Sequence, residues 1–556
     1  MPIRTAKTSG QRKGKKAVKG APVKASPRRL AASAKRAFKL TYATMFDPPE
    51  EMHTRFEKAL SGMKSTWGRD YPMLINGKDR YAESKFEDHS PINVDWNLGV
   101  FQRGTAEDAN AALAAARSAW PRWAAWKWQE RVRLLRKTAA LIEKRVYQLG
   151  AVLALEVGKN RMEALGEVQE TADLIYYYCD QMEANDGYVR AMGTDPLKGY
   201  KSSNQSVLKP YGVWVVISPF NFPFALTGGP GGAALVAGNC VVCKPSSDTP
   251  YSVRLLAEIL RDAGLPDGVF NYVTGGGATV GQTLVESPGV DGITFTGSYE
   301  VGMGIYRAFA NGRWPRPCIA EMGGKNPAIV SRNADLESAA IGILRSAFGL
   351  QGQKCSACSR IYVEKPVGDA LKQMLIDLTG KIKIGDPTER ANWMGPVINS
   401  NAYNHYANFM EELMRDGRVL IGGKQLVDGD LGKGYFCAAT IVEIPKDHRL
   451  WKVEMFLPIV TITEVDSLEE GLSLANEVDY GLTAGFYGSK KEAQRFFNSV
   501  HAGVLYANRP QGATTGAWPG FQPFGGWKGS GSTGKSGGSL YYVSQYMHEQ
   551  SQTMVE

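Results

Sequence analysis

Long hydrophobic runs are absent from this 556-residue sequence. No apolar stretch reaches the roughly 18 residues that a membrane-spanning helix needs, so we expect no membrane span. Histidine is scarce, with six residues, and the seven cysteines are an odd number without a recognisable secretory signal. A disulfide scaffold is therefore not expected. The composition favours a reducing compartment, the cytoplasm or, in a eukaryote, the mitochondrial matrix.

Acidic residues are missing from the first 40 positions, which hold 13 lysines and arginines. The rest of the chain is close to neutral, because it carries 52 of the 65 basic residues and all 55 acidic ones. Small residues and prolines separate the charges and leave little to bury, so residues 1–45 are predicted to form a disordered basic tail. We interpret it first as a solubilising segment. Organelle import, or binding to nucleic acid or another acidic surface, are the alternatives.

A metal site is also not expected, although two Cys-x-x-Cys pairs occur. Cys240 and Cys243 lie in a predicted strand, where residues three apart face opposite sides of the sheet. Cys355 and Cys358 lack further ligands, because the histidines are scattered along the chain. The sequence therefore predicts no metal.

The body of the chain is long enough for two or more domains, and its apolar periodicity is that of an α/β protein. Residues 106–158 carry apolar positions three and four apart, which indicates amphipathic helices. Residues 208–320 alternate strand-like and helical segments, as a parallel sheet requires, and residues 326–505 repeat the alternation.

One cysteine has the surroundings of a nucleophile. Cys355 follows Gly352, Gln353 and Lys354 on a predicted loop between two helices. A cysteine attacks as the thiolate, so it needs access and a setting that favours negative charge. Most intracellular cysteines are simply buried packing residues. Cys355 stands out because two upstream polar side chains fit the same chemistry.

Asn221 and Glu321 are those side chains. Asn221 lies between Pro219 and Pro223, and its amide suits the alkoxide that forms when a thiolate adds to a carbonyl. Glu321 stands just before two glycines, and a carboxylate of suitable pKa activates the water that hydrolyses a thioester. Alone, Asn221 would be an ordinary turn residue and Glu321 a solvated loop residue.

Taken together and in this order, the segments resemble those of the aldehyde dehydrogenase family over roughly residues 70–550. The resemblance implies an NAD(P)-dependent oxidoreductase with Cys355 as nucleophile, Asn221 as oxyanion donor and Glu321 as general base. The reaction would pass through a thiohemiacetal on the cysteine, hydride transfer and thioester hydrolysis. The implied fold is α/β, with a Rossmann-type cofactor domain, an α/β catalytic domain and a β oligomerisation arm.

Domain boundaries follow from the same resemblance. Residues 46–190 and 207–320 are expected to form the NAD(P)-binding domain, and residues 321–526 the catalytic domain. Residues 191–206 and 527–556 are expected to form the arm. The arm implies a homodimer or a higher homo-oligomer.

Within that arm, a hairpin is predicted around residues 194–205. The resemblance pairs it with a strand near the C-terminal end of the sequence, which we expect at residues 540–546. The pair would reach across to a second subunit.

The resemblance also assigns contacts with the cofactor, NAD with NADP as the alternative. Lys244 matches the lysine that contacts the adenosine ribose. Ser247 replaces the acidic residue usually found three positions later, so no carboxylate would repel a 2′-phosphate. Gly297 and Ser298 match a turn whose free N–H groups face the pyrophosphate.

Near the nicotinamide, Glu454 and Phe456 match the residues that hold the ribose and pack by the ring, whereas Leu457 replaces the usual glycine. The residues assigned to the cofactor are Ser218, Pro219, Phe220, Lys244, Ser247, Gly277, Gly281, Phe295, Gly297, Ser298, Gly302, Glu454 and Phe456.

The run from residue 515 to residue 526 resembles the anchor loop of 1-pyrroline-5-carboxylate (L-glutamate γ-semialdehyde) dehydrogenases. The resemblance implies oxidation of L-glutamate γ-semialdehyde to glutamate, a step of proline catabolism. The substrate contacts that it implies are Gly516, Ala517 and Ser356 on the α-carboxylate and Phe222 and Phe524 around the aliphatic chain.

Residues 508–514 are about three residues longer than the spacing of that subfamily. Another semialdehyde dehydrogenase, such as a succinate semialdehyde type, or a general aldehyde dehydrogenase therefore stays open. A thiol hydrolase would need a histidine base, and no histidine stands in a recognisable base motif. A non-catalytic binding protein with a nucleic-acid-binding tail is the remote alternative, and it would be expected to have lost the catalytic residues.

Overall fold

The computed structural model describes residues 48–196, 198–199, 201–513 and 516–555. The basic tail, residues 1–45, lies outside the described residues, and its disorder stays a prediction. Within the described ranges, no helix combines the length and apolarity needed to cross a membrane.

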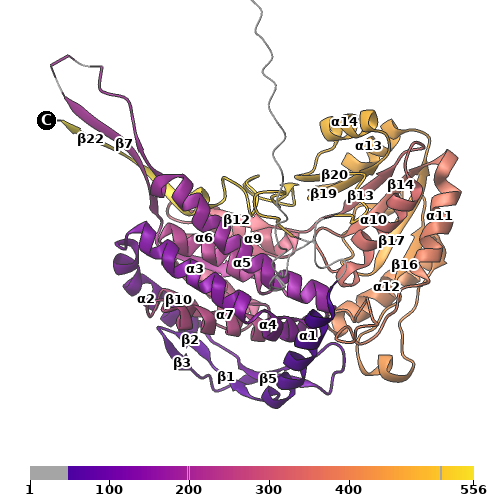
Figure 1. Cartoon of the computed structure of the whole chain (residues 1–556), viewed down its shortest axis with the longest axis horizontal. Coiled ribbons are helices and arrows are strands. Elements are labelled where there is room, and N and C mark those ends of the chain that lie inside the picture. Colours follow the sequence, from indigo (N-terminus) through magenta and orange to yellow (C-terminus); the bar gives the residue numbers. More distant parts are fainter. Residues whose placement is uncertain (1–47, 197, 200, 514–515, 556) are drawn as a thin grey trace, which may run out of the picture. The chain divides into compact units, whose positions relative to one another are not determined.

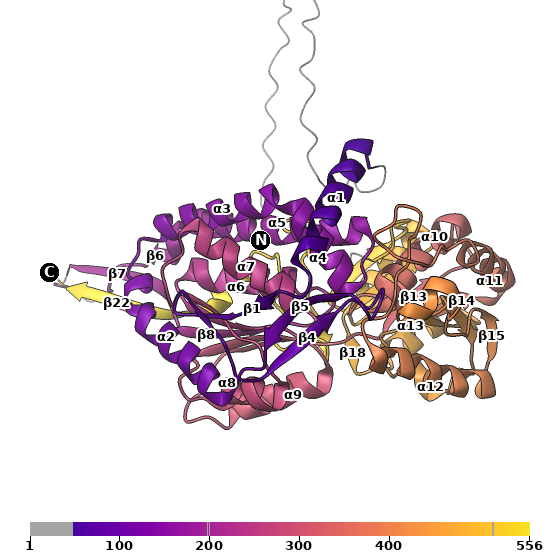
Figure 2. The ribbon, with the colours of Figure 1, turned by 90° about the horizontal axis from the view of Figure 1, so that it is seen from below.

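A layer of long helices opens the described chain (Figures 1 and 2). The predicted helical segment 106–158 is confirmed as three helices, and α5 follows it. Polar residues set the ends: Thr105 and Asp108 form a capping box at the start of α2, and Gly158 ends α4 with a φ of 78°. The helices are α1 (Glu50–Met63), α2 (Ala106–Ala124), α3 (Trp128–Lys144), α4 (Val146–Val157) and α5 (Arg161–Ala184). A small sheet, β1-β5-β4, lies beside them, with β1 (Asp70–Tyr71), β4 (Lys85–His89) and β5 (Asn97–Gln102).

The first large sheet has seven strands in the order β12-β11-β8-β9-β10-β2-β3. Strands β8 to β12 are parallel, as the alternating pattern predicts, and β2 and β3 add an antiparallel edge. The strands are β2 (Met73–Ile75), β3 (Lys78–Arg80), β8 (Val213–Ile217), β9 (Cys240–Lys244), β10 (Phe270–Tyr272), β11 (Gly292–Thr296) and β12 (Cys318–Glu321). The connecting helices are α6 (Ala225–Ala237), α7 (Pro250–Ala263), α8 (Gln282–Glu286) and α9 (Tyr299–Ala310). The chain order reverses at β8 and β11, and such a reversal opens a crevice at the carboxyl ends of parallel strands.

The second large sheet has the order β15-β16-β17-β14-β13-β19-β20, and only its edge strand β15 is antiparallel. Its strands are β13 (Asn326–Val330), β14 (Cys358–Glu364), β15 (Arg418–Ile421), β16 (Thr440–Glu443), β17 (Ile459–Val465), β19 (Thr483–Tyr487) and β20 (Val504–Ala507). The helices are α10 (Leu336–Phe348), α11 (Lys365–Thr379), α12 (Ser400–Asp416), α13 (Leu468–Asn476) and α14 (Lys490–Ser499). The two sheets are consistent with an α/β fold, while the expected domain boundaries stay a prediction.

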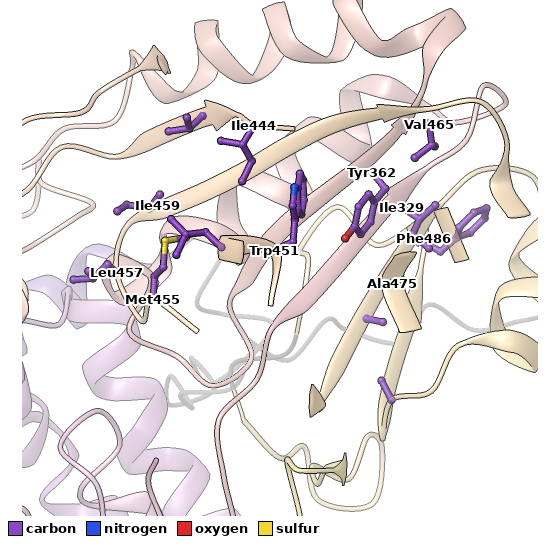
Figure 3. Close-up of a cluster of buried hydrophobic side chains, with 14 of the residues drawn as sticks. Ile329, Tyr362, Ile444, Trp451, Met455, Leu457, Ile459, Val465, Ala475 and Phe486 are labelled. Carbon is purple, nitrogen blue, oxygen red and sulfur yellow. The ribbon is translucent and has the colours of Figure 1, made fainter. Parts of the chain in front are cut away.

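A buried apolar cluster packs on this second sheet (Figure 3). Trp451 stacks on Tyr362 of β14 with ring centroids 5.0 Å apart, and Phe486 of β19 stacks on Phe496 of α14. Burial of such rings removes apolar area from water, worth about 25 cal/mol per Å². The sheet is therefore a rigid platform for the segment that precedes β14.

The predicted arm differs from the expectation in one strand. β6 (Val189–Ala191) and β7 (Ser202–Pro210) form the hairpin, but the third strand is β22 (Met547–Val555), not residues 540–546. Tyr542, Val543 and Tyr546 are buried, and residues 543–546 form a 3₁₀ turn rather than a strand. Apolar aromatic residues favoured a strand in the sequence, but their burial is satisfied by packing next to α6 and Trp214.

Candidate active site

The predicted site residues follow the carboxyl ends of the parallel strands. Asn221 lies after β8, Lys244 ends β9, and Gly277 and Gly281 bound a π-helical turn after β10. Gly297 and Ser298 come after β11. Because parallel strands end at one edge of the sheet, these residues share that edge.

The nucleophile turn lies between α10 and β14. A strand follows Cys355, so the helix predicted there is wrong; Cys358 enters β14 between β13 and β17. Leu350 and Gln351 have φ values of 46° and 56°. Gly352 has a φ of 70°, and a Cβ on it would lie 2.2 Å from the carbonyl oxygen of Leu457. This strained turn turns the chain sharply just before the cysteine.

Cys355 is half-buried and lines a cavity together with Glu321, Phe222, Ala517 and Phe524. Burial, with the nearby carboxyl groups of Glu454 and Glu321, raises the pKa of the thiol to about 12. The thiol is therefore protonated at neutral pH in this state and needs a base to accept its proton.

Asn221 is buried, and its Nδ2 donates to the carbonyl oxygen of Gln353 at 2.9 Å. The amide therefore lies against the nucleophile turn, two residues before Cys355. The side-chain oxygen of Gln353 accepts the N–H of Ile398, which holds the turn from its other side. A preorganised amide donor at this place is the arrangement that an oxyanion hole requires.

Glu321 ends β12, and its Oε2 has no hydrogen-bond partner among the described residues. Burial raises the pKa of this carboxyl to about 8, and a hydrogen bond from the backbone of Gly526 offsets the shift only in part. A carboxyl with a pKa near 8 gains and loses a proton around physiological pH, as a general base must.

The residues assigned to the adenosine side of the cofactor lie at the carboxyl edge of the first sheet. Lys244 is buried, its Nζ donates to the carbonyl oxygen of Pro245 at 3.0 Å, and burial lowers its pKa to about 8. Ser247 is exposed. Ser298 caps α9 by accepting the N–H of Val301, and Gly297 precedes it. The exposed start of α9 can therefore take a phosphate group.

Other residues assigned to the cofactor lie near the same edge. Ser218 is buried and accepts a hydrogen bond from the Thr227 hydroxyl at 2.7 Å, while Pro219 and Phe220 are half-buried. Phe295 is buried beneath Gly297, and Gly302 packs on Met322.

Glu454 and Phe456 contact segments that follow strands of the first sheet. Glu454 accepts the N–H of Gly324 at 2.7 Å, and burial raises its pKa to about 7. Phe456 adopts a φ of 58° and meets Phe220 edge-to-face at 5.8 Å. Lys325 is buried next to them with no hydrogen-bond partner for its Nζ in the described part of the chain. An unsatisfied buried amine and a carboxyl of raised pKa are typical of a site that receives a polar ligand.

Most of the residues assigned to the substrate share the cavity of Cys355. Phe222, Gly516, Ala517 and Phe524 line it. Ser356 is buried beside the cysteine but is not among the lining residues. Thr514 and Thr515, in the longer loop, lie outside the described residues.

The sequence analysis missed Glu170, which lines the same cavity. Its Oε1 accepts the N–H of Ala517 at 2.9 Å, and burial raises its pKa to about 8. The N–H expected to bind a substrate carboxylate therefore contacts a protein carboxyl in this state. The only sequence signal was an acidic residue within a helix that is buried on nearly all sides.

A wider outer cavity of about 450 Å³ adjoins the inner one, because Glu170 and Phe222 line both. Residues from α1, α5 and the end of α10 form its walls. Cys355 lines only the inner cavity.

Three potential metal ligands gather elsewhere, at Glu412, Asp416 and His448. His448 accepts the N–H of Leu450 through Nδ1, which favours a proton on Nε2. Arg449 pairs with Glu412 and Arg415 with Asp416. Ordinary ion pairing therefore explains the cluster, and the prediction of no metal stays a prediction.

Known proteins share these features across nearly the whole chain. The sequence pattern of the aldehyde dehydrogenase family matches residues 79–551. A 1-pyrroline-5-carboxylate dehydrogenase of Geobacillus sp. (strain WCH70) is 37% identical over 509 residues, which cover 90% of this chain and 96% of that protein. The corresponding protein of Halalkalibacterium halodurans is 38% identical over 508 residues, with the same coverage.

Solved structures agree. The 1-pyrroline-5-carboxylate dehydrogenase from Thermus, crystallised with bound NAD, superposes with a TM-score of 0.86 at 33% identity, covering 91% of this chain and 97% of that one. The matching pattern spans the second large sheet, the parallel strands of the first and the segments around Cys355, Asn221 and Glu321. This chain belongs to the aldehyde dehydrogenase family.

Proposed function

We propose that this enzyme oxidises L-glutamate γ-semialdehyde, the open form of 1-pyrroline-5-carboxylate, to glutamate with NAD or NADP. One observation carries the proposal: a single cavity is lined by a thiol and a carboxyl, Cys355 and Glu321, and also by a polar pair, Glu170 and the Ala517 N–H. The relatives named 1-pyrroline-5-carboxylate dehydrogenase support it. The proposed role is in proline catabolism.

The covalent steps use Cys355, Asn221 and Glu321. Glu321 accepts the thiol proton as the sulfur of Cys355 bonds to the aldehyde carbon, and the carbonyl oxygen becomes an alkoxide. The Asn221 amide donates to that oxygen, a contribution of about 3 kcal/mol in comparable oxyanion holes. Once the thiohemiacetal carbon has given up its hydride and the group on Cys355 is a thioester, Glu321 passes the thiol proton to solvent and is again a carboxylate. It then takes a proton from the water that attacks the thioester, and returns that proton to the sulfur of Cys355 as the C–S bond breaks and glutamate leaves.

The cofactor would be held along the carboxyl edge of the first sheet. Lys244 would contact the adenosine ribose, the start of α9 at Ser298 would receive the pyrophosphate, and Glu454 would hold the nicotinamide ribose. When bound, NAD(P) supplies the acceptor for the hydride that leaves the thiohemiacetal carbon. The exposed Ser247 leaves room for a 2′-phosphate, so NADP is the alternative cofactor.

Glu170 gives the substrate end its chemistry. The substrate carries an α-ammonium group beside its α-carboxylate, and the ammonium favours the ionised form of Glu170, which is then a partner of opposite charge. As Glu170 turns toward the substrate, the Ala517 N–H becomes available to the α-carboxylate. Phe222 and Phe524 line the path between this end and Cys355. A second polar end distinguishes the substrate from a simple aldehyde.

The enzyme is proposed to act as a homodimer or a higher homo-oligomer. Strands β7 and β22 extend from the rest of the chain (Figure 1). Most side chains along β22 are exposed. Exposed sheet edges pair readily with other strands, and a second subunit would cover this one.

The test compares kcat/KM for L-glutamate γ-semialdehyde, succinate semialdehyde and pentanal, each with NAD and with NADP. Reduced nicotinamide formation is followed optically. The proposal expects glutamate semialdehyde to be preferred over pentanal by about 10-fold to 100-fold, since each lost charge-assisted bond costs about 1.5–3 kcal/mol. A preference for succinate semialdehyde, or equal kcat/KM values for all three aldehydes, would contradict the proposed substrate. The proposed chemistry of Cys355 would be unaffected.

A further inference from the structure

Three glutamates form a row on α5, which packs behind the active site. Glu163, Glu167 and Glu170 are spaced by four and three residues, so their side chains emerge from one face of the helix. Each carboxyl contacts a different loop of the active site.

Glu163 contacts the nucleophile turn. Its Oε1 pairs with Nζ of Lys354 at 2.7 Å, and its Oε2 accepts the N–H of Leu350 at 3.3 Å. Leu350 is one of the residues with a positive φ, and Lys354 immediately precedes Cys355. Glu163 therefore holds both ends of the strained turn.

Glu167 contacts the oxyanion turn. Its Oε1 accepts the N–H groups of Phe224 and Ala225, at 2.9 and 3.1 Å, which begin α6 just after Asn221. Its other oxygen pairs with Lys159, whose Nζ lies 3.5 Å from the centroid of the Phe222 ring. Both charged side chains are fully buried. The ion pair thus holds the turn at two places, the Phe222 ring and the N–H groups of Phe224 and Ala225.

Glu170 contacts the substrate loop through Ala517. A Cβ on Gly516 would lie 2.2 Å from the Glu170 carboxyl, so a larger residue there would have to displace this carboxyl. The row therefore reaches the nucleophile, the oxyanion donor and the substrate loop from one rigid helix.

We propose that α5 aligns the three loops of the active site, with Glu163 and Glu167 as positioning residues for Cys355 and Asn221. The inference deepens the proposed function, because it says what keeps the thiol, the amide and the substrate end in register. A row on one helix fixes three loops relative to one another, which separate contacts with three elements would not do.

The test separates the nucleophile turn from the oxyanion turn by their readouts. Glu163→Gln should slow alkylation of Cys355 by iodoacetamide about tenfold, with KM for the aldehyde little changed. Glu167→Gln should lower kcat about 10-fold to 100-fold and leave the alkylation rate within about twofold of wild type. Lys159→Met should reproduce the Glu167→Gln result, and Lys159→Arg should restore most of it.

Both positioning variants remove one partner of a buried or partly buried ion pair, so folding is checked by thermal melting and NAD binding. The double variant Lys159→Met/Glu167→Gln removes both charges and avoids a lone buried one. Lys372→Met is the matched control, because Lys372 pairs with Glu464 and Glu443 away from the cavity. It should lower the melting temperature and leave kcat and alkylation unchanged.

Pentanal and iodoacetamide serve as probes that do not depend on the α-amino acid end of the substrate. If the proposed substrate is wrong but the alignment is right, the split between the Glu163 and Glu167 variants persists with these probes. If both variants lose alkylation and turnover equally, in proportion to the folded fraction, the row is merely structural and the inference is overturned.

Discussion

Two clusters of buried ionisable groups behave in opposite ways. Near α11, Nζ of Lys372 lies 2.7 Å from Glu464 and 3.1 Å from Glu443; although burial opposes it, these hydrogen bonds raise the pKa of the lysine. In the cavity of Cys355, burial instead raises the pKa of Glu321 to about 8, and no cation of the described residues forms an ion pair with it. The first cluster keeps its charges and contributes to stability. The groups of the second cluster are mostly neutral at physiological pH, but the pKa of Glu321 lies close enough to that pH for proton exchange.

The difference shows which buried groups are available for proton transfer. A paired charge is fixed in one protonation state over the physiological range, whereas an unpaired one can exchange a proton. Lys325 and Glu454 belong with the second cluster, because burial moves the pKa of each to about 7.

The largest effect is expected from Cys355→Ala. Without the sulfur no thiohemiacetal forms, so turnover should fall by about 10⁴-fold or more. NAD binding, measured by fluorescence quenching or calorimetry, should be unchanged, because the thiol does not hold the cofactor. Turnover near wild type would remove Cys355 from the mechanism.

Glu321→Gln should slow thioester hydrolysis by about 10²-fold to 10⁴-fold and hydride transfer much less. Rapid mixing should then show a burst of reduced nicotinamide followed by a slow steady state. Unchanged turnover without a burst would place the base elsewhere.

Glu170→Gln removes the proposed partner of the substrate ammonium. We expect kcat/KM for glutamate semialdehyde to fall about 10-fold to 100-fold, while the value for pentanal changes little. An equal loss for both aldehydes would show that Glu170 serves the fold of the loop rather than recognition.

Steady-state turnover should depend on pH through Glu321. Because its pKa is raised to about 8, the ionised base becomes more abundant as the pH rises, and the rate should increase up to about pH 8 and then level. The slope below that value is about tenfold per pH unit. A flat profile between pH 6 and about 8, with Glu321→Gln also flat, would contradict the assignment.

The smallest effect is expected from Cys358→Ala. This thiol is buried at the start of β14 and lies 3.5 Å from the carbonyl oxygen of Arg360, away from the cavity lining. The variant should lose about 1 kcal/mol of unfolding free energy and keep its kcat within about twofold. A loss as large as that of Cys355→Ala would show that the two thiols act together.

Sequence patterns were sufficient to place several assigned residues just after a strand, whereas their roles came from the family resemblance and stay predictions. Asn221, Lys244 and Ser298 each come just after an apolar run, and a parallel sheet brings such positions to one edge. The long α5 helix hid the remaining part, because it is buried on nearly all sides and has no clear polar face. Its row of glutamates is visible only once three separate loops are folded against it.

The arm shows a second limit. Residues 540–546 have a strand-like apolar composition, yet they pack in the interior, while the polar run Met547–Val555 pairs with β7. Backbone pairing of an exposed strand needs no apolar pattern, so burial alone was a misleading guide.

The pairing of β7 with β22 also sets the order in which the molecule is completed. Gln205 and Gln552 meet side by side at 2.7 Å although 347 positions separate them. Domains fold as they emerge from the ribosome, N-terminal parts first, so β7 has to wait with an open edge until β22 is translated. The arm sheet therefore closes last, and assembly of subunits through it would be confined to chains whose synthesis has passed β22.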